Sequence, residues 1–131
     1  MKGYWDRSAL VVACQDGAVR DRLESEGGVT RVHVFAEVFS TLTGGRLGYR
    51  VDPGDAATLI GELRELLDEI ELGSEEVVSA LGDAKSKGVR GGRVHDFLHA
   101  VAAVKAGCDR IWTLNVADFE GLFEALDVVE P

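Results

Sequence analysis

The stretch GGRVHDFLHAVAAVKAGCDRIWTLNVADF, residues Gly91 to Phe119, predicts a helix, a buried strand and a polar turn in succession. Apolar residues recur about every 3.6 positions in its first half, as they do on one side of a helix: Val94, Phe97, Leu98, Val101 and Ala102. Gly107 ends this helix, and the short apolar run from Arg110 to Leu114 is typical of a buried strand. Asn115 and Asp118 then form a polar turn behind the strand.

Two aspartates of this stretch lie where α/β proteins commonly bind ligands. Asp96 stands at the start of the predicted helix, and Asp118 follows the end of the predicted strand. Open parallel sheets bind ligands outside the carboxyl ends of their strands, so the pair indicates a site at that edge. An aspartate at a helix start is also an ordinary cap or partner of the helix dipole, and Asp96 alone fits either interpretation.

The remainder of the chain alternates predicted strands with predicted helices. Besides the strand at 110–114, strands are expected over residues 1–5, 29–33, 70–72 and 126–129. Helices are expected over residues 9–14, 16–26, 34–43, 53–67 and 74–87. This alternation predicts a three-layer α/β/α sandwich around a mainly parallel central sheet. No repeat, low-complexity tract or linker interrupts it, so residues 1–131 are expected to form a single domain.

Local patterns assign ordinary structural roles to several polar residues. Ser8 is a plausible cap of the first helix, which leaves Asp6 as a turn residue beside it. Glu37 lies off the apolar stripe of the helix at 34–43, so periodicity favours a solvated charge. His95 and His99 share a helix face, but they lack further ligands at zinc spacing and are expected to be surface or partly buried residues.

Length and composition favour an ordinary soluble protein. The chain has 131 residues, of which 46% are hydrophobic and 28% are charged. Its longest apolar run is far below the roughly 18 residues that a membrane helix needs. Asp6 and Arg7 stand where a signal peptide would carry its apolar core, so we expect a cytoplasmic protein with no membrane partner. Cys14 and Cys108 have no metal spacing and are expected to be reduced, small apolar residues.

The formal net charge of -9 argues against a general binder of polyanions, because such proteins normally present a basic face. One local basic stretch precedes the predicted site, and it is a candidate for contacts with RNA: Lys85, Lys87, Arg90 and Arg93. A solvated helix end is an equally good interpretation of any one of these residues alone. Trp5 and Trp112 lie in predicted strands, so core packing is favoured over stacking on bases.

Four segments of the chain carry a resemblance to a known family. They are YWDRSALV at Tyr4 to Val11, FAEVFSTL at Phe35 to Leu42, GGRVHDFLHAVAA at Gly91 to Ala103, and TLNVADF at Thr113 to Phe119. Their order and spacing resemble PIN-domain proteins, and most closely the small VapC-type toxins of prokaryotic toxin–antitoxin pairs. The resemblance spans essentially the whole chain and implies the PIN-like form of the α/β/α sandwich.

The resemblance implies a set of site residues. Four acids match the quartet that holds Mg²⁺ or Mn²⁺ in PIN nucleases: Asp6, Glu37, Asp96 and Asp118. Three small polar residues match positions that orient those acids, their metal or its water: Ser8, Thr113 and Asn115. Hard divalent cations prefer oxygen ligands, which agrees with such a set. Without metal, converging carboxylates repel one another, and the pKa of at least one of them should be raised.

The implied activity is metal-dependent hydrolysis of RNA phosphodiester bonds by an endoribonuclease. Asp6, Asp96 and Asp118 are the expected direct or water-bridged metal contacts. Glu37 is expected to orient the attacking water or to bind a second ion, and both roles stay open. The implied partners are the RNA substrate, a VapB-like antitoxin whose C-terminal segment covers the acidic site, and a second copy of the chain in a homodimer.

Two alternatives belong to other functional classes. A PIN fold can act as a binding scaffold without catalysis, because a fold does not by itself imply an activity. A receiver domain of a phosphorelay is also an α/β protein near this length, and it binds Mg²⁺ through paired acids after its first strand. This chain has the single Asp6 at that place, and Asp52 and Asp55 flank Pro53 in a loop, which disfavours a receiver.

Overall fold

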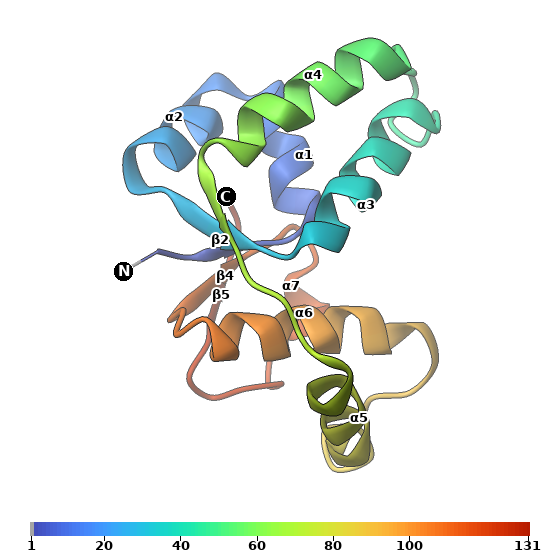
Figure 1. The fold of residues 1–131 in the computed structure, drawn as a ribbon, viewed down its shortest axis with the longest axis vertical. Coiled ribbons are helices and arrows are strands. Elements are labelled where there is room, and N and C mark those ends of the chain that lie inside the picture. The colour runs from blue at the N-terminus through green and yellow to red at the C-terminus, as the bar shows by residue number, and fades with distance from the viewer. Residues whose placement is uncertain (1) are drawn as a thin grey trace.

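Five short parallel strands form the central sheet in residues 2–131, the part of the chain that the computed structural model describes, and helices cover both faces (Figure 1). The strands are β1 Tyr4–Trp5, β2 Gly28–Thr30, β3 Leu67–Glu69, β4 Arg110–Trp112 and β5 Asp127–Val129. The helices are α1 Arg7–Gln15, α2 Gly17–Glu26, α3 Val32–Thr43, α4 Pro53–Arg64, α5 Ser74–Asp83, the 3₁₀ turn η1 Gly91–Arg93, α6 Val94–Lys105 and α7 Val116–Phe119. This is the predicted three-layer α/β/α sandwich.

The strand order places β1 in the centre of the sheet. The order is β3-β2-β1-β4-β5, and every neighbouring pair is parallel. Tyr4 of β1 aligns with Val29 on one side and with Ile111 on the other. The chain therefore winds outward from β1 through β2 and β3, and then continues through β4 and β5 on the opposite side. The winding reverses between β1 and β4, and such a switch point is where open α/β sheets bind ligands.

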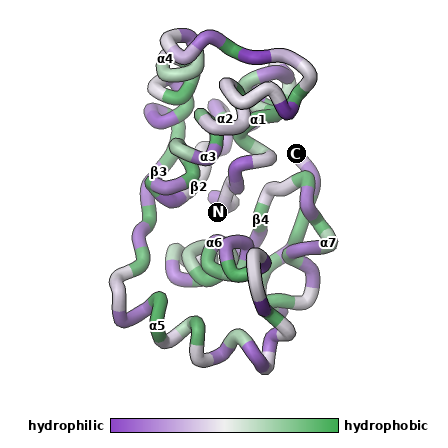
Figure 2. The backbone as a smooth tube through the Cα atoms, turned by 90° about the vertical axis from the view of Figure 1, so that its right-hand side faces the viewer, coloured by the Kyte–Doolittle hydropathy of each residue, from purple (hydrophilic) through white to green (hydrophobic). Residues whose placement is uncertain are grey.

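Alternation of side chains along the strands divides the core into two clusters. Trp5 and Trp112 are buried on the face covered by α1 to α4, and their rings lie 5.6 Å apart. Tyr4 and Ile111 are buried on the opposite face with Phe97 of α6. Figure 2 shows the two helical layers from the side, with α3 and α4 above the sheet and α5 and α6 below it. A two-residue strand can serve both layers because successive side chains point to opposite faces.

Two buried glycines make room for the tryptophans. A methyl group added at Gly28 would lie 2.6 Å from Trp5 Cδ1, and one added at Gly3 would lie 2.7 Å from Trp112 Nε1. Real side chains do not approach so closely, so each indole ring rests against bare backbone. Trp5 and Trp112 are core residues, as the sequence predicted.

The boundary between β2 and α3 differs from its prediction. A strand was expected over 29–33, but β2 ends at Thr30 and α3 begins at Val32. The amide of Val32 donates to Glu71 Oε1 at 2.7 Å, which satisfies one of the free amides at the helix start. A carboxylate 39 positions away in the sequence therefore stabilises this helix start, and no local sequence pattern predicts that contact.

Other predicted boundaries are also wrong by a few residues. The strand expected at 70–72 is instead β3, which spans Leu67–Glu69. It lies at the edge of the sheet, and its two acidic residues interrupt the apolar pattern from which a strand is predicted. The helices expected over 53–67 and 74–87 end at Arg64 and Asp83. In α5, Val78 and Leu81 are 67% and 46% exposed, whereas Ala80 is buried. Met1, the first residue of the strand predicted at 1–5, lies outside the described residues.

Two further observations concern the properties expected from composition. Among the described residues, no helix combines the length and apolar character needed to cross a membrane. Cys14 and Cys108 are free thiols, and burial raises the pKa of Cys14 to about 11, so this thiol is protonated at neutral pH. Cys108 lies between α6 and β4, and burial raises its pKa as well.

The contact between Gly28 and Trp5 generates a stability prediction. Gly28→Ala is expected to lower the free energy of unfolding by about 1–3 kcal/mol, because overpacking displaces the indole ring. Gly61→Ala is the matched control: Gly61 lies within α4 with nothing near its missing side chain, and alanine there should raise stability by about 0.5–1 kcal/mol. Urea unfolding followed by tryptophan fluorescence measures both changes. Equal stability of the two variants would contradict the proposed packing.

Candidate functional site

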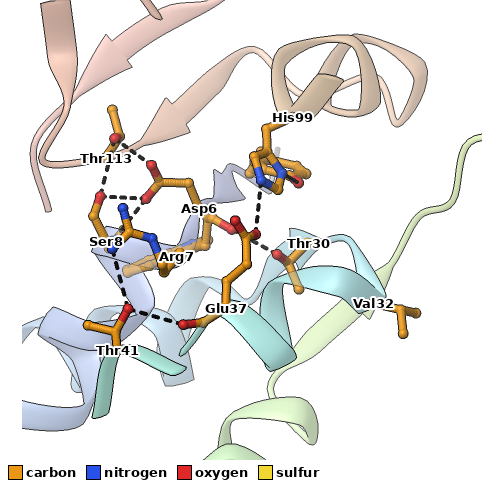
Figure 3. Close-up of polar contacts among 12 residues, drawn as sticks. Asp6, Arg7, Ser8, Thr30, Val32, Glu37, Thr41, His99 and Thr113 are labelled. Atoms are coloured by element: carbon orange, nitrogen blue, oxygen red, sulfur yellow. Dashed lines mark hydrogen bonds and ion pairs between the residues drawn. The ribbon is translucent and has the colours of Figure 1, made fainter. Parts of the chain in front are cut away.

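The Asp6 carboxylate lies at the carboxyl end of β1 and connects three parts of the fold (Figure 3). Its Oδ1 atom accepts hydrogen bonds from the amide of Ala9 at 2.9 Å and from Ser8 Oγ at 2.7 Å. Its Oδ2 atom accepts a hydrogen bond from Thr113 Oγ1 at 2.6 Å. Asp6 is therefore the N-cap of α1, and the prediction that Ser8 caps this helix is wrong. The aspartate is only 4% exposed, so three donors fix its orientation.

The loop behind β4 is tied to the start of α1 by the same hydroxyl groups. Ser8 Oγ accepts a hydrogen bond from the amide of Leu114 at 2.9 Å and lies 3.3 Å from Thr113 Oγ1. Thr113 Oγ1 in turn accepts from the amide of Asn115 at 2.9 Å. Ser8 and Thr113 thus contact Asp6 directly, whereas Asn115 takes part through its backbone. These bonds hold the ends of β1 and β4 together at the point where the sheet changes winding direction.

Glu37 belongs to a chain of hydrogen bonds that continues into the core. Its Oε1 atom lies 3.1 Å from His99 Nε2, and His99 Nδ1 lies 2.7 Å from the hydroxyl of Tyr4. Burial raises the pKa of Tyr4, so the phenol keeps its proton and can donate it to Nδ1. With Nδ1 as the acceptor, Nε2 is the ring nitrogen that donates to Glu37. Glu37 is therefore not the solvated helix charge that periodicity favoured, because its side chain is 24% exposed and hydrogen-bonded.

His99 is a residue of the site that the sequence interpretation missed. It was expected at the surface or partly buried, but it is 3% exposed, whereas His95 is exposed. One signal was available: His99 follows Asp96 by three positions, and residues so spaced share a helix face. Nothing in the sequence pairs His99 with Tyr4 or Glu37, because these partners come from β1 and α3.

The carboxyl groups of Glu37 and Asp96 differ in their protonation behaviour. Burial alone would raise the pKa of Glu37, but the hydrogen bond with His99 and the positive charge of Arg7 lower it. The pKa of Asp96 is raised, first by burial and then by the negative charges of nearby carboxylates, with His99 and Arg7 opposing this effect. One environment therefore favours an ionised carboxylate and the other a protonated one.

The charges that raise the pKa of Asp96 identify its neighbours. They belong to Asp118 and, more weakly, to Asp6. Asp96 lies in the first turn of α6, and Asp118 lies exposed in the short helix α7, which occupies the place of the predicted polar turn. The structure therefore brings carboxylates from the end of β1, from α6 and from α7 to one edge of the sheet. A raised carboxyl pKa is the effect expected where carboxylates converge.

The oxygen donors suit a hard cation of the kind that the resemblance implies. In the described part of the chain, no group of three His, Cys, Asp or Glu side chains is arranged to bind one ion jointly. Mg²⁺ does not need such a cage, because it is usually held by one or two carboxylates together with waters and substrate phosphate. Asp6 and Asp96 are the residues that would hold it, and Asp118 would act through water. The donor set fits a largely hydrated ion.

A cleft of about 460 Å³ lies beside these acids. Its walls include two carboxylates, Glu37 and Asp96. The basic and titratable side chains of the same cleft are Arg7, His33, Arg46 and His95. A negatively charged strand could approach the acids along this mixed surface, because the basic groups offset the repulsion.

The basic residues predicted to contact RNA are mostly placed elsewhere. Lys87 donates to the backbone oxygen of Leu122 at 2.8 Å and lies over the Phe123 ring, in a separate pocket between α5 and α6. Lys85 and Arg90 are exposed in the loop before η1. Arg93 reaches α7, where its Nη2 lies 3.5 Å from the backbone oxygen of Asp118. None of the four predicted contacts lines the cleft.

Comparisons with known proteins add no relative: no family model matches the chain, and no curated protein matches it. The resemblance to PIN-domain proteins therefore stays a prediction. A functional proposal for this chain depends on the arrangement of its own side chains.

The hydrogen bonds of Thr113 generate a second prediction. Thr113→Val keeps the shape of the buried side chain but removes the donor to Asp6 and the acceptor for the Asn115 amide. Unfolding free energy is expected to fall by about 1–3 kcal/mol, because a buried carboxylate and an amide each lose a partner. Thr58→Val on the exposed face of α4 is the control and should change stability by less than about 0.5 kcal/mol. Thermal and urea unfolding measure the stability of both variants. A Thr113→Val variant as stable as the parent would show that these hydrogen bonds do not hold Asp6 in place.

The opposite shifts of the two carboxyl groups generate a third prediction, tested by urea unfolding in EDTA. A raised pKa means that ionised Asp96 destabilises the fold at neutral pH, so Asp96→Asn should be more stable than the parent at pH 7. The stability advantage of Asp96→Asn over the parent should shrink as pH falls toward about 3.9, the pKa of an aspartate in the unfolded chain. Glu37→Gln should behave oppositely, because a lowered pKa stabilises the fold at pH 7 and that contribution is lost as pH falls.

Asp127→Asn, at an exposed position of β5, is the control for both carboxyl variants and should change stability at pH 7 by less than about 0.5 kcal/mol. Loss of stability in Asp96→Asn at pH 7 would mean that its neighbours are not the repelling carboxylates. A gain of stability in Glu37→Gln would likewise contradict the stabilising contact with His99.

Proposed function

We propose that this protein is a Mg²⁺- or Mn²⁺-dependent endoribonuclease that hydrolyses RNA phosphodiester bonds. The observation that supports it most is the convergence of Asp6, Asp96 and Glu37 at the carboxyl end of the central strand, beside a cleft that also carries basic groups. A buried aspartate held by three donors is preorganised as a ligand, which is what a metal-dependent hydrolase requires.

Each carboxylate has a distinct role in the proposed reaction. A bound Mg²⁺ ion supplies an activated water and offsets charge on the phosphate and leaving oxygen. Asp6 contributes a carboxylate whose orientation is fixed, and Asp96 becomes ionised more easily once positive charge is near. Glu37 is held ionised by His99, and its Oε2 atom has no hydrogen-bond partner within residues 2–131, so it can accept a proton from the attacking water.

The proposal extends to the toxin of a VapBC-type pair. The support is the resemblance of the four segments together with the net charge of -9, which would complement a basic antitoxin segment. The proposed partners are the RNA substrate, a VapB-like antitoxin that covers the acidic edge, and a second copy of the chain. Light scattering gives the molar mass of the purified protein and so tests for the homodimer. Co-purification with the product of a neighbouring small gene tests for the antitoxin.

A PIN-like scaffold without catalysis remains the second candidate. One specific observation favours it: within residues 2–131 the acids do not form a ready group of three metal ligands. The receiver domain is not favoured, because the strand order β3-β2-β1-β4-β5 differs from the 2-1-3-4-5 order of that class. The residues after β3 are Ile70 and Glu71, where a receiver would place its phosphorylated aspartate.

Cleavage of total RNA with Mg²⁺, Mn²⁺ or EDTA tests the nuclease proposal. Asp6→Asn and Asp96→Asn are expected to lose at least about 100-fold in rate, since even outer partners of metal ligands cost about 10–100-fold. Mg²⁺ should raise the melting temperature of the parent and of Asp127→Asn, and it should have a smaller effect on the two site variants. No cleavage by the folded parent, together with no metal-induced rise in melting temperature, would favour the scaffold.

A further inference from the structure

We propose that Arg7 and Arg46 form the phosphate-binding wall of the cleft and hold the backbone of a single-stranded RNA beside the carboxylates. This inference rests on the proposed nuclease function and names the part of the site that binds its substrate. The two arginines come from different elements, Arg7 from the first turn of α1 and Arg46 from the loop after α3. Both line the same cleft as Glu37 and Asp96.

Arg7 is a cation held in place without a carboxylate partner. Its Nη1 atom donates to Thr41 Oγ1 at 3.3 Å, and the Thr41 hydroxyl donates to the backbone oxygen of Glu37 at 3.1 Å (Figure 3). Thr41 is buried, so this contact fixes where the guanidinium lies. Arg7 makes no ion pair with any carboxylate of residues 2–131, whereas Arg20 and Arg64 are each paired with a glutamate. Most of its five donors are left for another acceptor.

An anion suits this unpaired guanidinium. Arg7 lines the cleft together with Glu37 and Asp96, and it is bonded to Thr41 on the helix that carries Glu37. Its positive charge lowers the pKa of Glu37 and opposes the rise in the pKa of Asp96. A phosphodiester bound in the cleft would receive hydrogen bonds from the guanidinium and would lie beside the acids that are proposed to hold the metal. Guanidinium groups match phosphate geometry with paired hydrogen bonds.

The remaining lining favours the backbone of the strand over its bases. His33 and His95 lie beside the arginines, and Ser40 and Thr41 add hydroxyl groups. Among the described residues that line the cleft, none is Phe, Tyr or Trp, so base stacking on large aromatic rings contributes little. Binding should depend mainly on phosphate contacts, with strong dependence on salt and weak dependence on base sequence.

The test measures affinity separately from cleavage. Fluorescence anisotropy with a labelled single-stranded RNA of mixed sequence, in EDTA and at several salt concentrations, compares the full-length parent with Arg7→Met, Arg7→Lys and Arg46→Met. Arg7→Met is expected to weaken binding by about 10- to 100-fold, the effect of losing charge-assisted hydrogen bonds. The slope of log affinity against log salt should fall by about 0.7 for each phosphate that the variant no longer neutralises. Arg7→Lys should keep the slope and lose part of the affinity.

The matched control is Arg64→Met, an exposed arginine of α4 that is paired with Glu69 outside the cleft, and it should bind RNA as the parent does. Thermal unfolding checks that each variant is folded. If Arg7→Met does not fold, Arg46→Met decides the matter, because Arg46 is exposed in a loop. Parent-like affinity and salt slope in the folded arginine variants would overturn the inference.

The outcomes also separate this inference from the nuclease proposal. Metal-dependent cleavage by the parent, with RNA affinity unchanged in Arg7→Met and Arg46→Met, would leave the nuclease standing and remove the phosphate-binding wall. Weakened binding in these variants, with no cleavage by the parent under any metal, would keep the wall and point to a scaffold that binds RNA.

Discussion

The hydrogen bonds of the Asp6 carboxylate hold the centre of this structure together. The side chain starts α1 by accepting the amide of Ala9, and through Ser8 and Thr113 it joins the end of β1 to the end of β4. These strands are neighbours at the point where the winding of the sheet reverses. A buried carboxylate is costly unless its oxygens are satisfied, so the loops that supply the donors must take up this arrangement for the protein to fold. The same constraint preorganises the carboxylate for a ligand.

Around this fixed group, the fold places acids in contrasting environments. His99, itself bonded to Tyr4, keeps Glu37 ionised, whereas burial and neighbouring carboxylates favour the protonated form of Asp96. Pairs of titratable groups with opposite shifts are typical of sites that perform acid–base or metal-assisted chemistry. A bound cation would relieve the repulsion at Asp96, whereas the stabilisation of Glu37 comes from His99. This difference supports a division between metal binding and handling of water in the proposed nuclease.

The local charge of the cleft differs from the charge of the chain. A net charge of -9 would repel RNA, but the structure concentrates Arg7 and Arg46 in the cleft beside Glu37 and Asp96. The basic cluster that is visible in the sequence, around Lys85 and Arg90, lies outside it. Proximity along the chain was misleading here because α6 separates residues that are close in sequence: Lys87 packs on Phe123 on one side, while Asp96 lies at the cleft on the other.

The sequence alone determined the alternation of strands and helices, and hence the α/β/α sandwich, because apolar periodicity and glycine breaks are local properties of the chain. It also placed Asp6 and Asp96 near strand and helix ends, from which a common edge follows in a parallel sheet. Tertiary structure alone decided the start of α3, which depends on Glu71, and the burial of His99 between Tyr4 and Glu37. It alone decided as well that Arg7 forms no ion pair with a carboxylate of residues 2–131, and that Lys87 lies in a different pocket from the acids. These outcomes depend on contacts between residues 34 to 95 positions apart, and such contacts leave no periodic trace in the sequence.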